Sequence, residues 1–389
     1  MSSRVHYFSF YLSEEMEKGR QAIPASFAKV EYVKEALIRS GAQLNLVSTA
    51  LVKSGMGFLG KTVIEKNEKE KQIYLPTFRY PGKFINKLTV LFMWLQIIIY
   101  VLLNVKKNET VLVYHSLLYI EPFKLLRKLK KFKLILEFND LYHAVNKKAL
   151  RFKEKEIRFI KEADEYLFMN SIAEEKFNNG KPYVLSFGNY NQPKRLNQQF
   201  SDEKTHVVYA GIIESSRRAA ILGAQSALYL DANYKIHILG FGEDHEIDEF
   251  EGIVKDINIE KGYEAVIFHG RLRGQDFSDF LHSCHIGLSS HAYSEEEMDS
   301  ANYTFPSKIP TYISHGLYVV SPNIPCVVQS PFSEFTIFYE KHKPEDIAKA
   351  IKEASLKLSE KNSLIRAPAD LIQELDRRFC EEIKKILAI

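Results

Sequence analysis

The stretch NYTFPSKIPTYISHGLYVVSP, residues 302–322, contains the start of a helix, its end and the strand that follows. Pro306 suits the first turn of a helix, and Gly316 suits its end. The apolar run from Leu317 to Val320 then predicts a buried strand. Lys308 lies in the first turn of the helix, where a lysine is disfavoured because the helix dipole is positive there. A bound anion would offset that cost, so we expect Lys308 to bind one.

Outward from this stretch, short apolar runs alternate with longer helical patterns along the whole chain. From Phe27 to Arg39, for example, apolar residues recur at helical spacing, and Gly41 suits the end of that helix. Strands separated by such helices predict an α/β fold, with parallel sheets that helices cover on both faces. The predicted strands are residues 5–11, 44–46, 110–114 and 133–138 in the first half, and 206–209, 235–239, 265–268 and 285–288 in the second.

The length predicts two domains, because 389 residues exceed the roughly 250 to 300 at which a single core usually divides. Residues 188–205 have almost no apolar content and contain Gly188, Pro193 and several amides, which is typical of a linker. We therefore expect domains at 1–187 and 206–365, joined by this linker.

Charge and cysteine content exclude several classes of function. The 53 basic and 49 acidic side chains give a net charge of only +4, too balanced for nucleic-acid binding by bulk charge. The three cysteines form no CxxC pair, so neither a disulfide framework nor a zinc site is expected. A reducing compartment follows, and the N-terminus lacks the apolar core of a signal peptide. Both observations favour a cytoplasmic protein.

Two segments suggest contact with a membrane surface. The apolar run 88–103 is shorter than the ~20 residues that span a bilayer, so we expect a buried or membrane-facing helix that does not span. Residues 123–133, FKLLRKLKKFK, place basic side chains on one helical face, which predicts either peripheral binding to an anionic membrane or a solvated face. The basic residues are Lys124, Arg127, Lys128 and Lys131, opposite Leu125, Leu129 and Phe132.

Two further strand ends in the second half could bind an anion, since ligands of parallel sheets lie beyond the carboxyl ends of strands. The strand HVVYAG ends at Gly211, and Glu214, Arg217 and Arg218 follow it, which suits either a phosphate or a solvated helix start. In IHILGFGED, Gly240 and Gly242 follow a strand directly. They do not complete a dinucleotide fingerprint, because His245 takes the third glycine position, and a simple turn is the alternative.

Taken in order, these motifs resemble the second domain of GT-B glycosyltransferases, family 4 in particular. The series is a YxG turn, basic residues, LGxGxE, a strand ending near Gly270, and PSKxxxYxxxGxxVV. The first half is similar as well: Arg20 to Gly41 resembles the family's loop and first helix, and ETVLVYHS resembles a strand that ends in histidine, here His115. The segment ILEFNDLYH resembles members that act in capsule and exopolysaccharide assembly.

The resemblance implies two Rossmann-like domains with parallel sheets facing a central cleft. A nucleotide-diphosphate sugar, UDP-linked, would bind to the second domain. A saccharide or lipid-linked saccharide acceptor would bind to the first. Sugar transfer would proceed with retention, with no metal ion and no cofactor. The last helix, 366–389, would pack back on the first domain.

Individual roles follow from the same resemblance. Arg218, with its neighbour Arg217, would contact the donor diphosphate, and Ser307 and Lys308 would lie beside the phosphates and ribose. Where the family has two glutamates that include the ribose ligand, this chain has Tyr303 and Thr311, and the glutamates at 295–297 are a possible substitute or a solvated loop. Gly211 and Gly240 match the family's close-approach glycines and would bind the donor with nearby Gly242, and Arg20 would bind the acceptor. His115 is expected either to contact the sugar or the acceptor as a catalytic residue or to make a structural hydrogen bond. Glu137 and Asp140 lie at the end of a strand and could bind acceptor hydroxyls, with a helix N-cap as the alternative for Asp140.

Two other functions remain open on sequence grounds. A nucleotide-sugar epimerase can share the GT-B shape, but it needs a pair of catalytic carboxylates in the cleft. A non-catalytic GT-B subunit would explain the missing glutamates, although the presence of both Arg218 and Lys308 argues against it.

Overall fold

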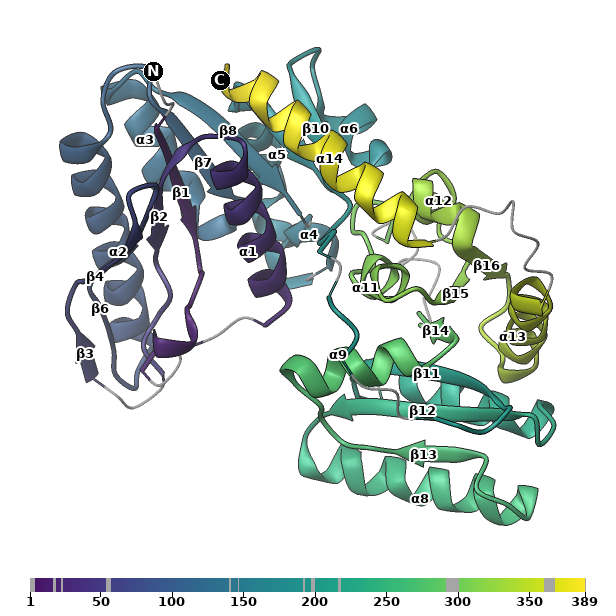
Figure 1. Ribbon diagram of the computed structural model, residues 1–389. Coiled ribbons are helices and arrows are strands. Elements are labelled where there is room, and N and C mark those ends of the chain that lie inside the picture. Colours follow the sequence, from purple (N-terminus) through teal and green to yellow (C-terminus); the bar gives the residue numbers. More distant parts are fainter. Residues whose placement is uncertain are drawn as a thin grey trace. The chain divides into compact units, whose positions relative to one another are not determined.

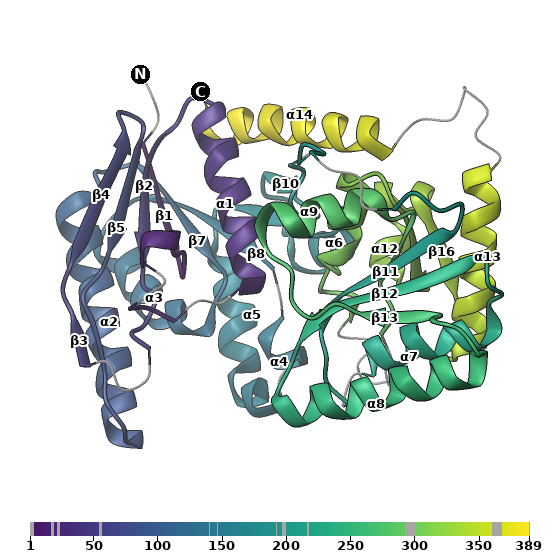
Figure 2. The same cartoon turned by 60° about the horizontal axis from the view of Figure 1, so that its bottom comes forward.

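The computed structural model describes residues 4–16, 19–21, 24–53, 57–139, 141–145, 147–191, 193–196, 200–215, 218–291, 301–359 and 368–388. The chain divides into two compact units (Figures 1 and 2). The first domain contains Met1–Asn189 together with Arg377–Ile389, and the second contains Tyr190–Asp376.

The first domain is built on an eight-stranded sheet with helices on both faces (Figure 1). Its strand order is β10-β9-β8-β7-β1-β2-β5-β4, and every neighbouring pair is parallel except β4 with β5. The strands are β1 (Arg4–Ser9), β2 (Gln43–Ser48), β4 (Thr62–Asn67), β5 (Glu70–Tyr74), β7 (Thr110–Tyr114), β8 (Lys133–Phe138), β9 (Glu165–Phe168) and β10 (Tyr183–Leu185), with a separate ribbon of β3 (Gly57–Leu59) and β6 (Thr77–Arg79). The helices are α1 (Pro24–Arg39), α2 (Lys83–Asn104), α3 (Ile120–Leu129), α4 (Tyr142–Val145), α5 (Lys153–Glu162) and α6 (Ser171–Phe177).

The second domain has a six-stranded sheet in which every pair of neighbours is parallel. Its order, β13-β12-β11-β14-β15-β16, corresponds to the Rossmann arrangement 3-2-1-4-5-6. The strands are β11 (Thr205–Ile212), β12 (Tyr234–Phe241), β13 (Val266–Phe268), β14 (Ile286–Leu288), β15 (Tyr318–Pro322) and β16 (Thr336–Tyr339). The helices are α7 (Ala219–Gln225), α8 (Asp244–Lys261), α9 (Gly274–Ser283), α11 (Lys308–Ser314), α12 (Pro325–Val328) and α13 (Pro344–Ser359).

The segment expected to be a linker, 188–205, lies mostly within the second domain. The Leu196 amide donates to Asp279 at 3.0 Å, and the Phe200 ring stacks on His206 with 4.0 Å between centroids. These described parts of the segment are therefore packed on the second domain. The last helix, α14 (Pro368–Leu387), joins the first domain from Arg377 onward, where Phe379 packs on Tyr32 of α1.

The two segments with membrane-like sequences differ from expectation. Helix α2 has 22 residues, and among the described helices of at least 18 residues it is the one long and apolar enough to cross a membrane by length and composition. The basic face expected for residues 123–133 is present only in part, because α3 ends at Leu129, before Lys131, and Arg127 forms a two-pronged ion pair with Asp164. Leu125 and Leu129 are exposed rather than buried, and the buried residues of α3 are Ile120, Pro122, Phe123 and Leu126.

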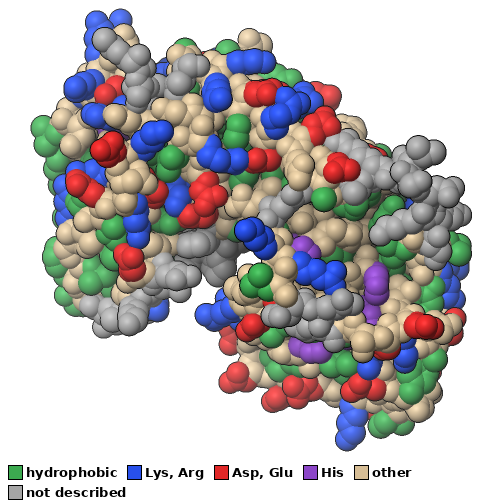
Figure 3. Space-filling model, viewed as in Figure 1, with side chains coloured by type: hydrophobic (Ala, Val, Ile, Leu, Met, Phe, Trp, Pro, Cys, Tyr) green, Lys and Arg blue, Asp and Glu red, His purple; other side chains and the backbone are tan. Residues whose placement is uncertain are grey.

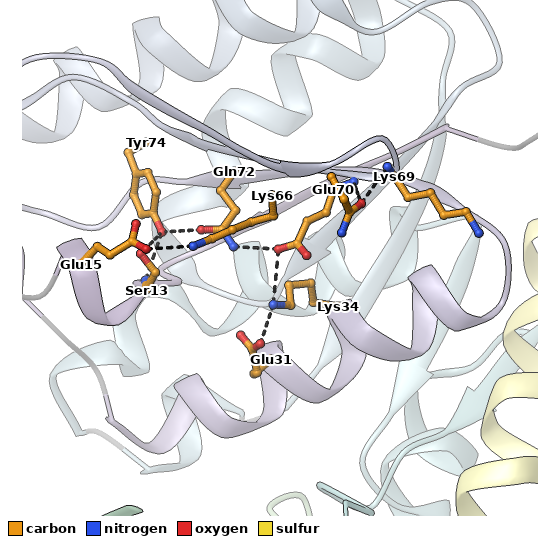
Figure 4. A network of polar contacts seen from close by, with 10 residues as sticks. Ser13, Glu15, Glu31, Lys34, Lys66, Lys69, Glu70, Gln72 and Tyr74 are labelled. Carbon is orange, nitrogen blue, oxygen red and sulfur yellow. Dashed lines mark hydrogen bonds and ion pairs between the residues drawn. The ribbon is translucent and has the colours of Figure 1, made fainter.

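A polar network ties α1 to strand β5 in the first domain (Figure 4). The buried Lys34 ammonium pairs with Glu31 and, at 3.3 Å, with the buried carboxylate of Glu70. Gln72 donates to Glu70 at 2.7 Å and accepts from the Tyr74 hydroxyl at 3.1 Å. These ion pairs raise the pKa of Lys34 against the opposing effect of burial. The network therefore keeps a charged lysine stable between a helix and a sheet.

We expect Lys34→Met to lower the free energy of unfolding by about 3 kcal/mol, because it leaves Glu70 buried without its cation. Lys66→Met is the matched control. Lys66 also pairs with a carboxylate, that of Glu15 at 3.0 Å, but this pair is exposed and its loss should cost less than about 1 kcal/mol. Urea unfolding followed by circular dichroism measures both variants, and equal losses would contradict this assignment.

Three histidine rings of the second domain form a hydrogen-bonded chain. His206 bonds to His237 with 2.8 Å between ring nitrogens, and His237 bonds to His269 at 3.0 Å. The Asp202 carboxylate closes one end of the chain, 2.5 Å from His206. Burial, and then the neighbouring rings His269 and His206, lower the pKa of His237 to about 2, and burial lowers the pKa of His269 as well. The chain is therefore stable with His237 and His269 neutral.

The free energy of unfolding should fall in acid. The unfolded chain, whose histidine pKa values are near 6.5, binds protons there, whereas His237 and His269 stay neutral in the folded protein. Their contribution is complete above about pH 6.5 and declines as the pH falls, by up to about 1.4 kcal/mol per pH unit for each histidine. We expect His237→Gln to reduce this slope and His245→Gln, on the exposed side of α8, to leave it unchanged. Urea titrations between about pH 7 and 5 test this, and an unaltered slope in His237→Gln would be the contrary result.

Candidate functional site

The strand order of the second domain reverses between β11 and β14. From β11 the chain continues to β12 on one side, and from β14 it continues to β15 on the other. The loops after the two strands therefore diverge, and this point beyond the carboxyl ends is where open α/β sheets bind ligands. Gly211 lies at the end of β11, and Ser289 follows the end of β14. The residues of the predicted donor site belong to this edge of the sheet.

Lys308, the first residue of α11, crosses the end of β11. Its ammonium lies 4.4 Å from the centre of the Tyr209 ring and 3.3 Å from the Tyr209 hydroxyl. A Cβ placed on Gly211 would lie 2.7 Å from Lys308 Cε and 2.8 Å from Nζ. Gly211 is thus required so that the lysine can approach the strand. The structure brings these two predicted residues together and holds a half-buried cation at the switch point.

Arg218 precedes α7, the helix that follows β11. Its backbone is left-handed, with φ +51° and ψ +13°, a conformation that is unfavourable for a residue with a Cβ. The loop keeps it there because its amide donates to Glu214 O at 3.2 Å and its carbonyl accepts from Leu222 at 2.8 Å. The side chain is exposed. Strained backbone of this kind is concentrated at functional sites. Arg217 and the glutamates 295–297 lie outside the described residues.

Gly240 and Gly242 are required by close packing at the end of β12, and their role in donor binding stays a prediction. A Cβ on Gly240 would lie 2.6 Å from the Gly211 carbonyl oxygen, and one on Gly242 would lie 2.4 Å from the Ile213 carbonyl oxygen. The chain after β11 therefore passes directly over the end of β12. The two glycines permit the backbone path that carries Gly211 and Arg218.

Tyr312 is a site residue that the sequence analysis missed. Its buried hydroxyl accepts from the Ala210 amide at 2.8 Å and donates to Leu288 O at 3.2 Å, so it links the ends of β11 and β14. A Cβ on Gly287 would lie 2.3 Å from the Tyr312 ring. The available signal was the tyrosine of PSKxxxYxxxG, four residues after Lys308, on the buried face of the helix.

Ser307 immediately precedes α11, and Thr311 lies in its first turn. Ser307 is exposed, whereas the Thr311 hydroxyl donates to the Ser307 carbonyl at 2.9 Å. Tyr303, at the other position of the missing glutamates, is buried. A role of Thr311 toward a ribose stays a prediction.

Arg20 was expected to bind the acceptor, but the structure places it in the core of the first domain. Its side chain is 0% exposed, and its guanidinium donates to Ala50 O at 2.7 Å and to Leu75 O at 2.8 Å. The cation also lies 5.5 Å from the centre of the Tyr74 ring. Arg20 therefore joins loops at the end of β2 and β5, and the expectation is corrected to a structural role.

His115 and Glu137 are likewise buried. His115 stacks on Phe138, and its Nε2 lies 3.6 Å from Glu156, which also accepts from His143 Nδ1 at 2.7 Å. This favours the structural alternative for His115. Glu137 accepts a hydrogen bond from Tyr7 and lies 4.0 Å from the Lys29 ammonium, and burial raises its pKa. Asp140, the third candidate here, lies outside the described residues.

A metal site would need several ligating side chains gathered at one point. Within the described ranges, no group of three or more His, Cys, Asp or Glu side chains is placed to hold a metal ion.

No protein-family model and no curated protein matches the chain. Solved structures match it over nearly its whole length. Trehalose-6-phosphate synthase from Burkholderia multivorans has a TM-score of 0.67 at 9% identity and covers 100% of this chain and 96% of that one. Sucrose-phosphate synthase from Thermosynechococcus elongatus has 0.60 at 12% identity, covering 99% and 95%. The Escherichia coli trehalose-6-phosphate synthase bound with UDP-2-fluoroglucose has 0.65 at 9% identity, covering 99% and 98%.

These similarities show the fold. The chain has the GT-B fold, an α/β architecture with two parallel-sheet domains, as the sequence predicted. They do not support the narrower resemblance to capsule-type members of family 4.

Gly211 and Gly240 allow the site geometry to be tested by one added methyl group. Gly211→Ala would strike the mobile end of the Lys308 side chain, so we expect weaker UDP binding with little change in melting temperature. Gly240→Ala would strike the backbone oxygen of Gly211, so we expect a clear loss of melting temperature. Calorimetric titration with UDP and thermal melting distinguish the two. Wild-type UDP affinity in Gly211→Ala would show that Lys308 is not used as described.

Proposed function

We propose that the protein is a glycosyltransferase that moves a sugar from a nucleotide-diphosphate sugar to a saccharide acceptor. The observation that carries the proposal is the Lys308 ammonium held over the end of β11 at Gly211, at the switch point of the second domain. A diphosphate placed there would contact an ammonium whose position is already fixed by its packing on the Tyr209 ring. The GT-B fold supports the assignment, because its solved examples here synthesise sugar phosphates.

In this mechanism the chain stabilises the leaving diphosphate. Negative charge grows on the diphosphate as its bond to the anomeric carbon breaks, and Lys308 and Arg218 would neutralise it without reorganising at that moment. These side chains perform the neutralisation that a metal ion performs in other enzymes, so we propose a reaction without one. The sequence resemblance supports transfer with retention of configuration.

The donor and acceptor are proposed at the level of chemical class. The Escherichia coli neighbour holds UDP-2-fluoroglucose, and this supports a UDP-linked donor for the chain. For the acceptor we propose a saccharide of surface polysaccharide synthesis in the cytoplasm, on the basis of the segment ILEFNDLYH. Because Arg20 and His115 are buried, the acceptor would be recognised by other residues of the first domain.

Calorimetric titration with UDP tests the donor site. We expect Lys308→Ala and Arg218→Ala each to weaken binding about ten-fold or more, the effect of losing one charge-assisted hydrogen bond, with nearly unchanged melting temperatures. Lys235→Ala is the matched control, because Lys235 is a lysine of the same domain at the beginning of β12, paired with Glu264 at 2.9 Å. It should bind UDP like the wild type.

Activity is measured as release of the nucleoside diphosphate from a panel of nucleotide sugars, with and without EDTA. Turnover that persists in EDTA and falls in Lys308→Ala is the expected result. Unchanged UDP affinity in both site variants, or turnover lost in EDTA and restored by manganese, would refute the proposed site or its metal-free chemistry respectively.

A further inference from the structure

Helix α2 carries an uninterrupted apolar stripe on its exposed side. The stripe residues are spaced three or four apart, so they lie along one face over about 28 Å of helix. Hydrophobic side chains reach the surface at the left margin of Figure 3, where Figure 1 places α2. We call this the α2 stripe, and its residues, all at least 40% exposed, are Phe84, Leu88, Leu91, Leu95, Ile99, Leu102 and Leu103.

The opposite face of α2 is fixed to the first domain along its length. Trp94 Nε1 donates to Leu118 O at 2.8 Å, and the Tyr100 hydroxyl bonds to His6 at 3.0 Å. At the C-terminal end, Lys130 donates to the carbonyl of Leu102 at 2.7 Å. The helix is therefore a part of the domain that lies against its sheet and cannot leave it without breaking these bonds. This geometry favours a helix that lies on a surface over one that crosses a bilayer.

Both ends of the stripe are basic. The exposed lysines Lys83 and Lys87 lie in the first turns of α2, and Lys106 and Lys107 follow its last turn. The helix itself has no acidic residue. Glu109, the nearest acid in sequence, bonds to His6 at 3.2 Å and to the amide of Lys106. An apolar face with cations at its ends matches the acyl region and the anionic headgroups of a lipid surface.

An apolar cavity of about 990 Å³ adjoins the stripe. It lies at the switch point of the first domain, where Phe10 follows β1 and Leu117 follows β7. Leu91 belongs both to the stripe and to the lining of the cavity, and Trp94 lines it beside Leu91. Its charged lining residues are Lys87, Arg151 and Lys155, with Glu121 paired to Lys155 at 2.8 Å. A hydrocarbon chain with a phosphate at its end has the same two kinds of surface.

We propose that the α2 stripe docks the first domain on an anionic bilayer and that the adjoining cavity receives a hydrocarbon chain from that bilayer. The charges argue against a second copy of the chain as the occupant. If two copies packed stripe against stripe, the lysines at the ends of α2 in one copy would lie against those of the other copy, in either the parallel or the antiparallel orientation. An anionic lipid surface attracts the same lysines. The inference does not depend on the donor site of the second domain.

Co-sedimentation with vesicles tests the docking. The wild-type protein should sediment with vesicles of phosphatidylcholine and phosphatidylglycerol in equal parts, and less with phosphatidylcholine alone or at high salt. Leu95→Glu combined with Ile99→Glu should reduce binding about ten-fold or more, since it places two charges in the stripe away from the cavity. Phe84→Glu, at the exposed start of α2, is a second variant that should reduce binding without touching packed residues.

The matched control is Ile259→Glu combined with Leu356→Glu. These side chains are also exposed and apolar on helices, at 68% and 64%, but they belong to the second domain. The control should sediment like the wild type. A wild-type protein that stays in the supernatant at low salt, or stripe variants that bind normally, would overturn the proposal. If the protein instead forms a dimer without vesicles, does not bind lipid, and becomes monomeric in the stripe variants, the stripe is an interface with a second copy.

The cavity is tested through Trp94, the single tryptophan of the chain. Vesicles whose acyl chains carry bromine should quench Trp94 fluorescence relative to unbrominated vesicles. Leu117→Gln, which makes the cavity more polar, should reduce the quenching while sedimentation is kept. Sedimentation without quenching of the wild type would refute chain entry. UDP affinity, measured on the same samples, should stay at the wild-type value in every stripe variant, which separates a failure here from a failure of the donor site.

Discussion

The proposed donor site depends on the approach of Lys308 to the backbone at Gly211. A cation can lie over the end of a strand only where no side chain intervenes, and a Cβ on Gly211 would lie only 2.7 Å from Lys308 Cε, so any other residue would displace the lysine end. The neighbouring backbone is held in place by Tyr312, whose hydroxyl joins β11 to β14, and by Gly240, which lets the chain pass over β12. These features together position one half-buried charge at the point where a parallel sheet binds anions.

Two parts of the molecule bury polar groups for a different purpose. The Lys34 network and the His206 chain lie within single domains, and their members bond mainly to one another. Networks of this kind stabilise one packing, whereas Lys308 lies at the edge of a parallel sheet where such folds bind ligands. The same residue types therefore serve structure or binding according to their partners, and charge alone does not distinguish them.

The sequence predicted the buried parallel strands well and the edges poorly. The strands 110–114 and 133–138 are present with the predicted bounds, because continuous apolar runs mark strands covered on both faces. Strand β4, with the sequence TVIEKN, was missed because it is an antiparallel edge strand that is largely exposed. The close approaches at Gly211 and Gly240, and the position of Lys308 at the start of α11, were predictable because a turn and a close approach restrict residue type. The burial of Arg20 and the pairing of Arg127 on α3 were not predicted, because both depend on partners far away in sequence. Arg20 donates to the carbonyl of Leu75, and Arg127 pairs with the carboxylate of Asp164.

The switch points of the two domains are lined by residues of opposite chemical character. In the second domain the divergence of β11 and β14 is lined by Lys308, Tyr209 and main-chain groups, which suits a charged diphosphate. In the first, the divergence of β1 and β7 opens on a mainly apolar cavity next to the α2 stripe. Shared topology thus fixes where each domain can bind and leaves the lining to decide what it binds. The solved GT-B neighbours match this chain over 95% or more of their length, but only about one residue in ten is identical. The comparison therefore shows the fold, and the acceptor has to be inferred from the side chains of the first domain.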